Sequence, residues 1–437
     1  GILLAGLALH LVSVSVRPHL SYAYDLYEGG TGHVNYIQYI AEKGSLPPPD
    51  KGWSFYHPPL YYLAGAGVYT LATACGLEDP FKPLQILSLF FYWIFIAYSL
   101  LLIREFVRQR WLYSLAALLL VVWPAGSINA IRLGNDVLLY ALFVAALFHG
   151  HRWFVTGSSR QLVIASVFCG LGFLAKISIA PLAALLGGLI VWRLARRTVP
   201  ALRVWTAALA LGIMAAGFAA GSLDNLTAAK KAGKPGWYLA PFSNIDAVPD
   251  SRLLTNNRID NFLFPDIPLW FGSTFISSRD DATGRSNYWN YLFKTALYGE
   301  FEFREGFRRS LVAPGMNVLL VILLCLSVSG AASLLFRPAA RVAATTASGL
   351  ADCRLRPVRQ YRRKMARHSL QTRAASRPAD FRFVAGACFF LLVLLLVARV
   401  QNSMPALNDF RYVVPVLPAL VATIAVGIGR LRARPGL

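Results

Sequence analysis

Long apolar runs separated by short polar segments dominate the chain. Ten of these runs approach the length at which a helix crosses a bilayer, which is about 20 mostly apolar residues. They are 2–16, 84–103, 112–128, 137–151, 161–175, 177–192, 203–221, 313–336, 383–400 and 412–429. The pattern predicts an all-α polytopic membrane protein with about ten transmembrane helices. No small-residue cleavage site follows the first run, so we expect a membrane helix there rather than a signal peptide.

Basic residues orient these spans. If the N-terminus lies in the cytoplasm, Lys and Arg concentrate in the cytoplasmic loops, as the positive-inside rule requires. The densest such loop is 337–382, with RPVRQYRRKMAR at its centre. If one further run, 58–75, spanned the bilayer, every later loop would lie on the opposite side of the membrane and the basic loops would face outward. We therefore expect it to be a juxtamembrane or re-entrant helix on the outer side.

This topology divides the chain into three parts. Residues 1–221 form an N-terminal transmembrane module with a first outer loop at 17–83. Residues 222–312 form a large outer loop or small domain, and 313–437 supply the C-terminal transmembrane helices with the basic loop.

Composition supports a membrane protein and argues against a nucleic-acid-binding protein. Of the 437 residues, 56% are hydrophobic and only 15% are charged, whereas soluble domains carry about 25% charged residues. The formal net charge of +22 suggests nucleic-acid binding at first sight. The cations lie in short loops between apolar runs, however, so we expect membrane lipids and no nucleic acid as partners. The five cysteines show no zinc spacing and are expected to be small core residues.

The first outer loop carries two carboxylates directly after a membrane span. Asp25 and Glu28 lie three residues apart and would share a face if that segment were helical. They are candidates for a general base or for metal ligands at the mouth of a cavity. A solvated acidic loop is the alternative.

Two patterned segments follow in the same loop. Residues 31–43 place apolar side chains on one helical stripe, which predicts a helix lying at the membrane surface. The stripe consists of Val34, Ile37, Ile40 and Ala41. Residues 53–62 read WSFYHPPLYY, where two prolines fix the backbone direction and five aromatic rings offer a wall for a sugar or an isoprenoid. An interfacial aromatic belt is the alternative.

Charged residues stand at the outer ends of several spans, where they usually face a cavity or a partner. Arg132 precedes Asp136, and the two could form an ion pair with each other. Lys176 lies between two spans, where a lipid phosphate would explain it and a snorkelling lysine is the alternative. Arg411 begins the last span and could pair with Asp409 or hold a phosphate. Near the end of the second outer loop, 287–303 adds aromatic rings, a lysine and Glu300 that could line a groove.

Taken in order, an acidic first outer loop, HPPLYY, RLGND, LAK and RYVVPVLP resemble the motifs of polyprenyl-phosphate-dependent glycosyltransferases with the GT-C fold. The nearer relatives by this resemblance are the protein O-mannosyltransferase and lipid A aminoarabinose transferase group. The chain departs from the family in its first loop, because Asp25 and Glu28 are separated and His33 comes later. It also has Asn135–Asp136 instead of two carboxylates.

The resemblance implies a GT-C helical domain with juxtamembrane helices and a cavity open to the outside and to lipid. It implies transfer of a sugar from a polyprenyl-phosphate donor to a lipid, glycan or protein acceptor, with inversion, in the bacterial inner membrane with the site facing the periplasm. Asp25 or Glu28 would be the catalytic base. The candidates for binding substrate and lipid phosphate are Lys176, Arg411, Arg132, Tyr412, His57 and His33. The candidates for a divalent-cation ligand or a structural acid are Asp136, Asn135 and Glu300.

Two other functions fit parts of the sequence. An O-antigen polymerase or ligase would also have a large outer loop and outer arginines, but would use a diphosphate-linked donor. A lipid or solute transporter is less well supported, because the chain shows no paired Gly- or Pro-broken helices in two matching halves.

Overall fold

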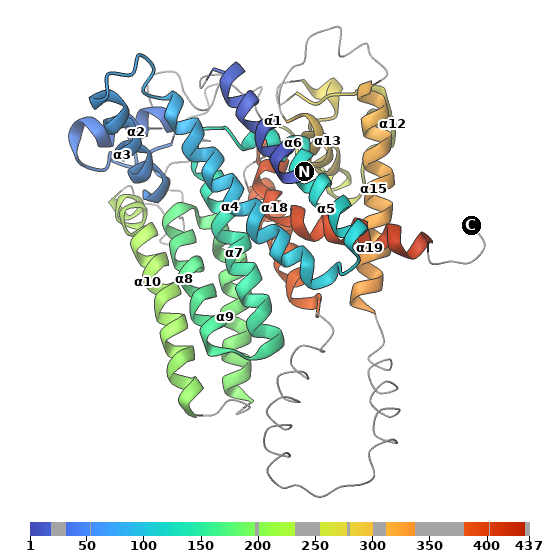
Figure 1. Ribbon diagram of the computed structural model, residues 1–437. Coiled ribbons are helices and arrows are strands. Elements are labelled where there is room, and N and C mark those ends of the chain that lie inside the picture. Colours follow the sequence, from blue (N-terminus) through green and yellow to red (C-terminus); the bar gives the residue numbers. More distant parts are fainter. Residues whose placement is uncertain are drawn as a thin grey trace, which may run out of the picture.

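The computed structural model describes residues 1–18, 32–52, 54–196, 201–231, 254–277, 280–299, 312–336, 380–401 and 403–432. Within these ranges the regular secondary structure is helical (Figure 1). The candidate bases Asp25 and Glu28 lie outside the described residues. So do Glu300, the candidate metal ligand or structural acid, Trp53, and 337–379 of the basic loop.

Seven of the described helical segments are long and apolar enough to cross a membrane. They are α4 (Lys82–Phe106), α7 (Asn135–Thr156), α9 with its preceding turn (Ile177–Ala195), α10 (Val204–Ala228 within Ala201–Lys231), α15 (Val312–Leu335), α18 (Arg382–Gln401) and η5 with α19 (Phe410–Arg432). Three shorter apolar helices accompany them: α1 (Ile2–Val16), α5 (Arg110–Val122) and α8 (Ser159–Ala175). Each of the ten predicted apolar runs thus falls on helix, which confirms the all-α polytopic fold.

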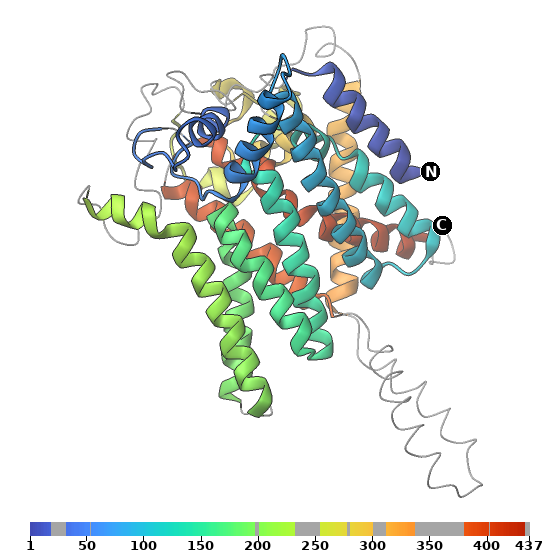
Figure 2. The ribbon, with the colours of Figure 1, turned by 60° about the vertical axis from the view of Figure 1, so that its left-hand side comes forward.

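Helix α7 is the central element of the bundle. It packs against α4 and α8, and most of its length is buried, whereas α10 and α15 are largely exposed. Figure 2 shows α7, α8, α9 and α10 running side by side, with α10 on the outside. Exposed apolar side chains on the outer helices suit contact with lipid. Helix α7 is therefore enclosed by its neighbours, and α10 and α15 lie at the periphery.

The pair α15 and α19 packs through glycines. A side chain at Gly330 would collide with the carbonyl oxygen of Thr423, and one at Gly427 would collide with that of Leu326. A hydrogen bond of 2.7 Å between the hydroxyls of Ser327 and Thr423 joins the same two helices. Small residues and polar contacts of this kind let helix backbones approach closely in membranes.

Prolines break two of the predicted spans. The run 112–128 is split at Trp123, after which α6 (Pro124–Asn129) begins with proline at its first position, where the missing N–H is tolerated. The last run starts as a 3-10 segment, η5 (Phe410–Val416), which contains Pro415. The regular helix α19 (Leu417–Arg432) begins only afterwards. Both breaks lie at the end of the bundle that carries the candidate site.

Three groups of short elements gather at that end. They are α2 (His33–Lys43) with α3 (Leu60–Ala74); α11 (Asp260–Leu263), α12 (Ile267–Gly272), η3 (Asp281–Thr283) and α13 (Tyr288–Tyr298); and η1 (Ile177–Ile179) with η4 (Pro405–Asn408). Helix α2 confirms the predicted stripe, since Val34, Ile37 and Ile40 are buried in a second apolar cluster that includes Leu133 and Leu138 beside α7. Helix α3 has 15 residues, which is about 22 Å, and it packs against α2.

Candidate active site

The first part of the site forms where α7 begins and α8 ends. The side-chain amide of Asn135 donates to the carbonyl oxygen of Ala175 at 2.8 Å, which ties the two helix ends together. Lys176 follows in an extended conformation, so its side chain leaves the helix axis and reaches the first turn of α7. There its Nζ lies 2.5 Å from Oδ1 of Asp136. Each of the two residues is only 8% exposed.

This ion pair argues against two of the alternatives that the sequence offered, an Arg132–Asp136 pair and a snorkelling Lys176. Asp136 pairs with Lys176 rather than with Arg132, and Lys176 is buried rather than reaching for the membrane surface. A buried carboxylate next to a buried ammonium is stable because each compensates the charge of the other. The site therefore contains a charged pair in a place shielded from water.

The second part comes from η5, which follows the C-terminal end of α18. The carboxylate of Asp409 caps η5 by accepting from the backbone N–H of Arg411 at 2.9 Å, and its second oxygen lies 3.7 Å from Nε of Arg411. Nη2 of Arg411 donates to the hydroxyl of Tyr412 at 2.6 Å. Arg411 is thus paired with Asp409, and its guanidinium is held in one orientation.

Tyr412 joins the two parts. Nζ of Lys176 lies 4.8 Å from the centre of the Tyr412 ring, and Cζ of Arg411 lies 4.6 Å from it. Both are cation–π distances. Two cations that are 235 residues apart in the sequence therefore converge on one aromatic ring.

A third cation, Arg132, lies close to this group. It is 5% exposed in the turn between α6 and α7, within electrostatic range of Arg411, Asp136 and Asp409. Burial, and after it the positive charge of Arg411, lower the pKa of Arg132 to about 9, which still leaves it protonated at neutral pH. The described part of the site thus holds three cations and two carboxylates.

Aromatic and imidazole rings close one side of the cluster. Nδ1 of His33 lies 2.7 Å from the hydroxyl of Tyr62, and the His33 ring stacks on the His57 ring with centroids 5.4 Å apart. Tyr62 in turn stacks on Tyr36 at 3.9 Å. Burial lowers the pKa of His33 to about 3 and lowers that of His57 as well. Both imidazoles are therefore neutral at physiological pH and act as hydrogen-bonding groups, not as cations.

Two hydrogen bonds fix the loop that carries His57. The side-chain amide of Asn225, on α10, donates to the carbonyl oxygen of Tyr56 at 2.7 Å. The hydroxyl of Tyr36, on α2, donates to the carbonyl oxygen of His57 at 3.3 Å. Asn225 and Tyr62 are positioning residues that the sequence did not single out for this task. A polar amide near the end of a long apolar helix was the available signal for Asn225.

In the described part of the segment 287–303, residues 287–299, the lysine has a different place from the one expected. Lys294, on α13, is fully buried and donates to the carbonyl oxygens of Leu269 and Ser273, so it fastens the end of α12 instead of lining a groove. Thr295 accepts from the backbone N–H of Phe410 at 2.9 Å. This part of α13 supports η5 from behind.

The described residues contain no group of three or more His, Cys, Asp or Glu side chains that could hold a metal ion. Asp136 is engaged by Lys176, and the side-chain N–H of Asn135 by a backbone carbonyl. The described part of the site sets fixed cations and their carboxylate partners on one side and neutral rings on the other, at the end of an apolar bundle.

No family model matches the chain, and no curated protein matches it. Among solved structures, the chain is similar to ArnT from Cupriavidus metallidurans bound to undecaprenyl phosphate, with 15% identity, 98% of this chain and 77% of that chain covered, and a TM-score of 0.39. It is also similar to the apo state of the same protein, with the same identity and coverage and a TM-score of 0.35. A likeness of this size identifies no family for the chain.

Proposed function

We propose that the protein is a membrane glycosyltransferase that moves a sugar from a polyprenyl-phosphate carrier to an acceptor outside the cytoplasm, with inversion at the anomeric carbon. One observation carries this proposal. Lys176, Arg411 and Arg132 gather at one end of an apolar helical bundle, beside Asp136 and Asp409. A ligand with an anionic head and a long apolar chain matches both parts.

A monophosphate carrier is the proposal, and a diphosphate-linked donor is the alternative that the transfer assay below distinguishes. Among the described residues the cluster holds three cations, Lys176, Arg411 and Arg132, and two carboxylates, Asp136 and Asp409.

The reaction needs a base and a stabilised leaving group. The base, for which Asp25 and Glu28 are the candidates, takes the proton of the acceptor hydroxyl while its oxygen attacks the anomeric carbon. The bond between that carbon and the phosphate oxygen breaks, and its electron pair goes to the departing polyprenyl phosphate. Fixed cations stabilise the charge that develops there, and losing one such contact lowers the rate by about 10²–10³.

Binding provides the first test. The full-length protein in detergent is mixed with polyprenyl phosphate or with the matching polyprenol, and complexes are counted by native mass spectrometry. We expect the phosphate to bind and the alcohol to bind far more weakly. Equal retention of both would refute an anion site at the cation cluster.

Transfer provides the second test. Protein in liposomes receives a radiolabelled polyprenyl-phosphate sugar and an envelope extract as acceptor, and Asp25→Asn and Glu28→Gln are assayed separately. Glu42→Gln, at an exposed acid of α2, is the matched control. We expect at least one of the first two variants to be inactive and the control to be active. Full activity of both would show that neither is the base, and turnover only of a diphosphate donor would favour the polymerase or ligase alternative.

A further inference from the structure

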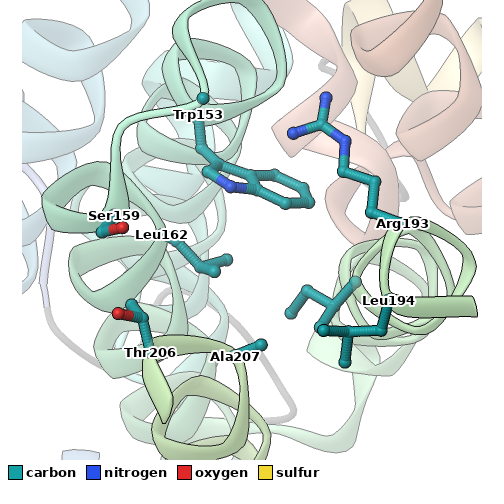
Figure 3. A pocket seen from close by; sticks show the side chains of 9 residues that line it. Trp153, Ser159, Leu162, Arg193, Leu194, Thr206 and Ala207 are labelled. Atoms are coloured by element: carbon teal, nitrogen blue, oxygen red, sulfur yellow. The ribbon is translucent and has the colours of Figure 1, made fainter. Parts of the chain in front are cut away.

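A cavity of about 40 Å³ lies between α7, α8, α9 and α10 (Figure 3). Trp153 and Arg193 stand at one end of it, and Ser159 and Thr206 lie across from them. Its remaining wall is apolar and includes Leu162, Ile190, Leu194 and Ala207. The cavity is thus amphipathic, with one fixed cation.

The guanidinium of Arg193 is held in place by the end of α7. Its Cζ lies 4.4 Å from the centre of the Trp153 ring, and its Nη2 donates to the carbonyl oxygen of Phe154 at 3.0 Å. Arginine has five N–H donors in a planar fork that matches phosphate oxygens. An orientation fixed by stacking lowers the entropy lost when such an anion binds.

The surroundings of the cavity are polar on the same side. Helix α8 begins here, and its N-cap residue Ser158 makes no side-chain capping bond, so the first N–H groups of the helix favour a nearby anion. Two exposed arginines, Arg160 and Arg196, flank the cavity on α8 and after α9. The region is therefore electropositive at the bundle end.

This cavity is far from the candidate active site. Asp136 and Trp153 lie on the same helix, 17 residues apart, which corresponds to about 25 Å. A separation of that size is close to the thickness of the hydrocarbon core of a bilayer, about 30 Å. The cavity and the cation cluster therefore face opposite leaflets.

We propose that this cavity binds an anionic phospholipid of the leaflet opposite the active site. The phosphate of the head group lies against Arg193 and the start of α8, and the acyl chains stay in the bilayer outside the bundle. Basic pockets between transmembrane helices bind anionic head groups in this way. The inference rests on the cavity alone and holds whether or not the protein transfers a sugar.

The test compares phosphatidylglycerol with phosphatidylcholine on the full-length protein in detergent, with lipid occupancy measured by native mass spectrometry. Arg193→Gln removes the cation. Arg432→Gln is the matched control, because Arg432 also stacks on a tryptophan, with Cζ 5.2 Å from the Trp111 ring, but lies on α19. We expect the affinity for phosphatidylglycerol to fall about fivefold in the first variant and to stay unchanged in the second.

A second variant, Ala207→Val, narrows the cavity and leaves Arg193 in place; it provides the test if Arg193→Gln does not fold. We expect it to lower phosphatidylglycerol occupancy as well. Equal losses in Arg193→Gln and Arg432→Gln, or equal affinities for the two lipids, would overturn the proposal. Displacement of the lipid by excess inorganic phosphate would mean that the site takes a free anion, which would also overturn it.

Discussion

The ion pair between Lys176 and Asp136 gives the sharpest prediction. Both side chains are about nine-tenths buried, at 10% and 12% exposure, and their charged atoms are 2.5 Å apart. At an effective dielectric constant of about 20, the attraction between them is about 7 kcal/mol. Taking two ions out of water costs several kcal/mol for each, so the pair as a whole is close to neutral for stability. Removing one partner leaves the other charge buried and uncompensated.

We therefore expect Lys176→Met to lower the free energy of unfolding by about 3–5 kcal/mol. The double variant Lys176→Met with Asp136→Leu replaces both ions by apolar groups and should recover most of that loss. The assay is unfolding in detergent, followed by intrinsic fluorescence, for the wild type, both single variants and the double variant. Binding of polyprenyl phosphate is measured on the same four proteins.

Stability and binding should then separate. The double variant should be as stable as the wild type or nearly so. Its affinity for the lipid phosphate should nevertheless be low, because it lacks the ammonium that would contact the phosphate. A double variant as unstable as the single one would refute the reasoning about burial. A stable double variant with wild-type binding would refute a role for Lys176 in holding the phosphate.

Three further predictions follow from other parts of the structure. Arg411→Lys keeps the charge but loses the planar fork, so the affinity for polyprenyl phosphate should fall about tenfold, while Arg258→Lys at an exposed position should have no effect; equal effects would contradict a specific role. Gly427→Leu should lower the free energy of unfolding in detergent by about 1–3 kcal/mol because a side chain there meets the backbone of α15, whereas Gly212→Leu, with nothing within 4 Å, should be tolerated; similar losses would argue against the close packing. The folded-state pKa of His33 is about 3, below the ordinary value of 6.5, so its contribution to stability is complete above pH 6.5 and is lost as the pH falls toward 3. Lowering the pH from 7.5 to 5.0 should therefore reduce the free energy of unfolding of the wild type by about 2 kcal/mol more than that of His33→Gln. Identical pH profiles for the two proteins would show that His33 is not buried in its neutral form.

Much of the fold follows from local patterns in the sequence. Apolar runs located the spans because a helix in lipid must be apolar along its whole length. The stripe at Val34, Ile37 and Ile40 located α2 because helical periodicity is visible in eleven residues. The sequence did not predict the helix breaks at Pro124 and Pro415, because a proline does not interrupt the apolar character of a run.

Less of the arrangement of the site could be predicted from the sequence. Lys176 pairs with Asp136 because α8 ends just before it and its backbone is extended. No local pattern in the sequence predicts either feature. The stacking of His33, Tyr62 and Tyr36 depends on how α2 lies against α3. The sequence marked Arg411 because charges at the ends of apolar runs are rare, and it offered Asp409 as a partner, but it did not show that the Tyr412 ring would lie beside both Arg411 and Lys176. The roles of Asp25 and Glu28 remain predictions.

The hydrogen bond from Asn225 to the carbonyl oxygen of Tyr56 has a consequence for how the bilayer acts on this protein. The candidate span of helix α10, Val204–Ala228, has 25 residues, about 37 Å, which exceeds the hydrocarbon thickness of about 30 Å. A helix with that mismatch adjusts its tilt when the membrane becomes thicker or thinner. Because α10 is attached to the segment that carries His57, we expect lipid chain length to change the shape of the candidate site without any residue being altered.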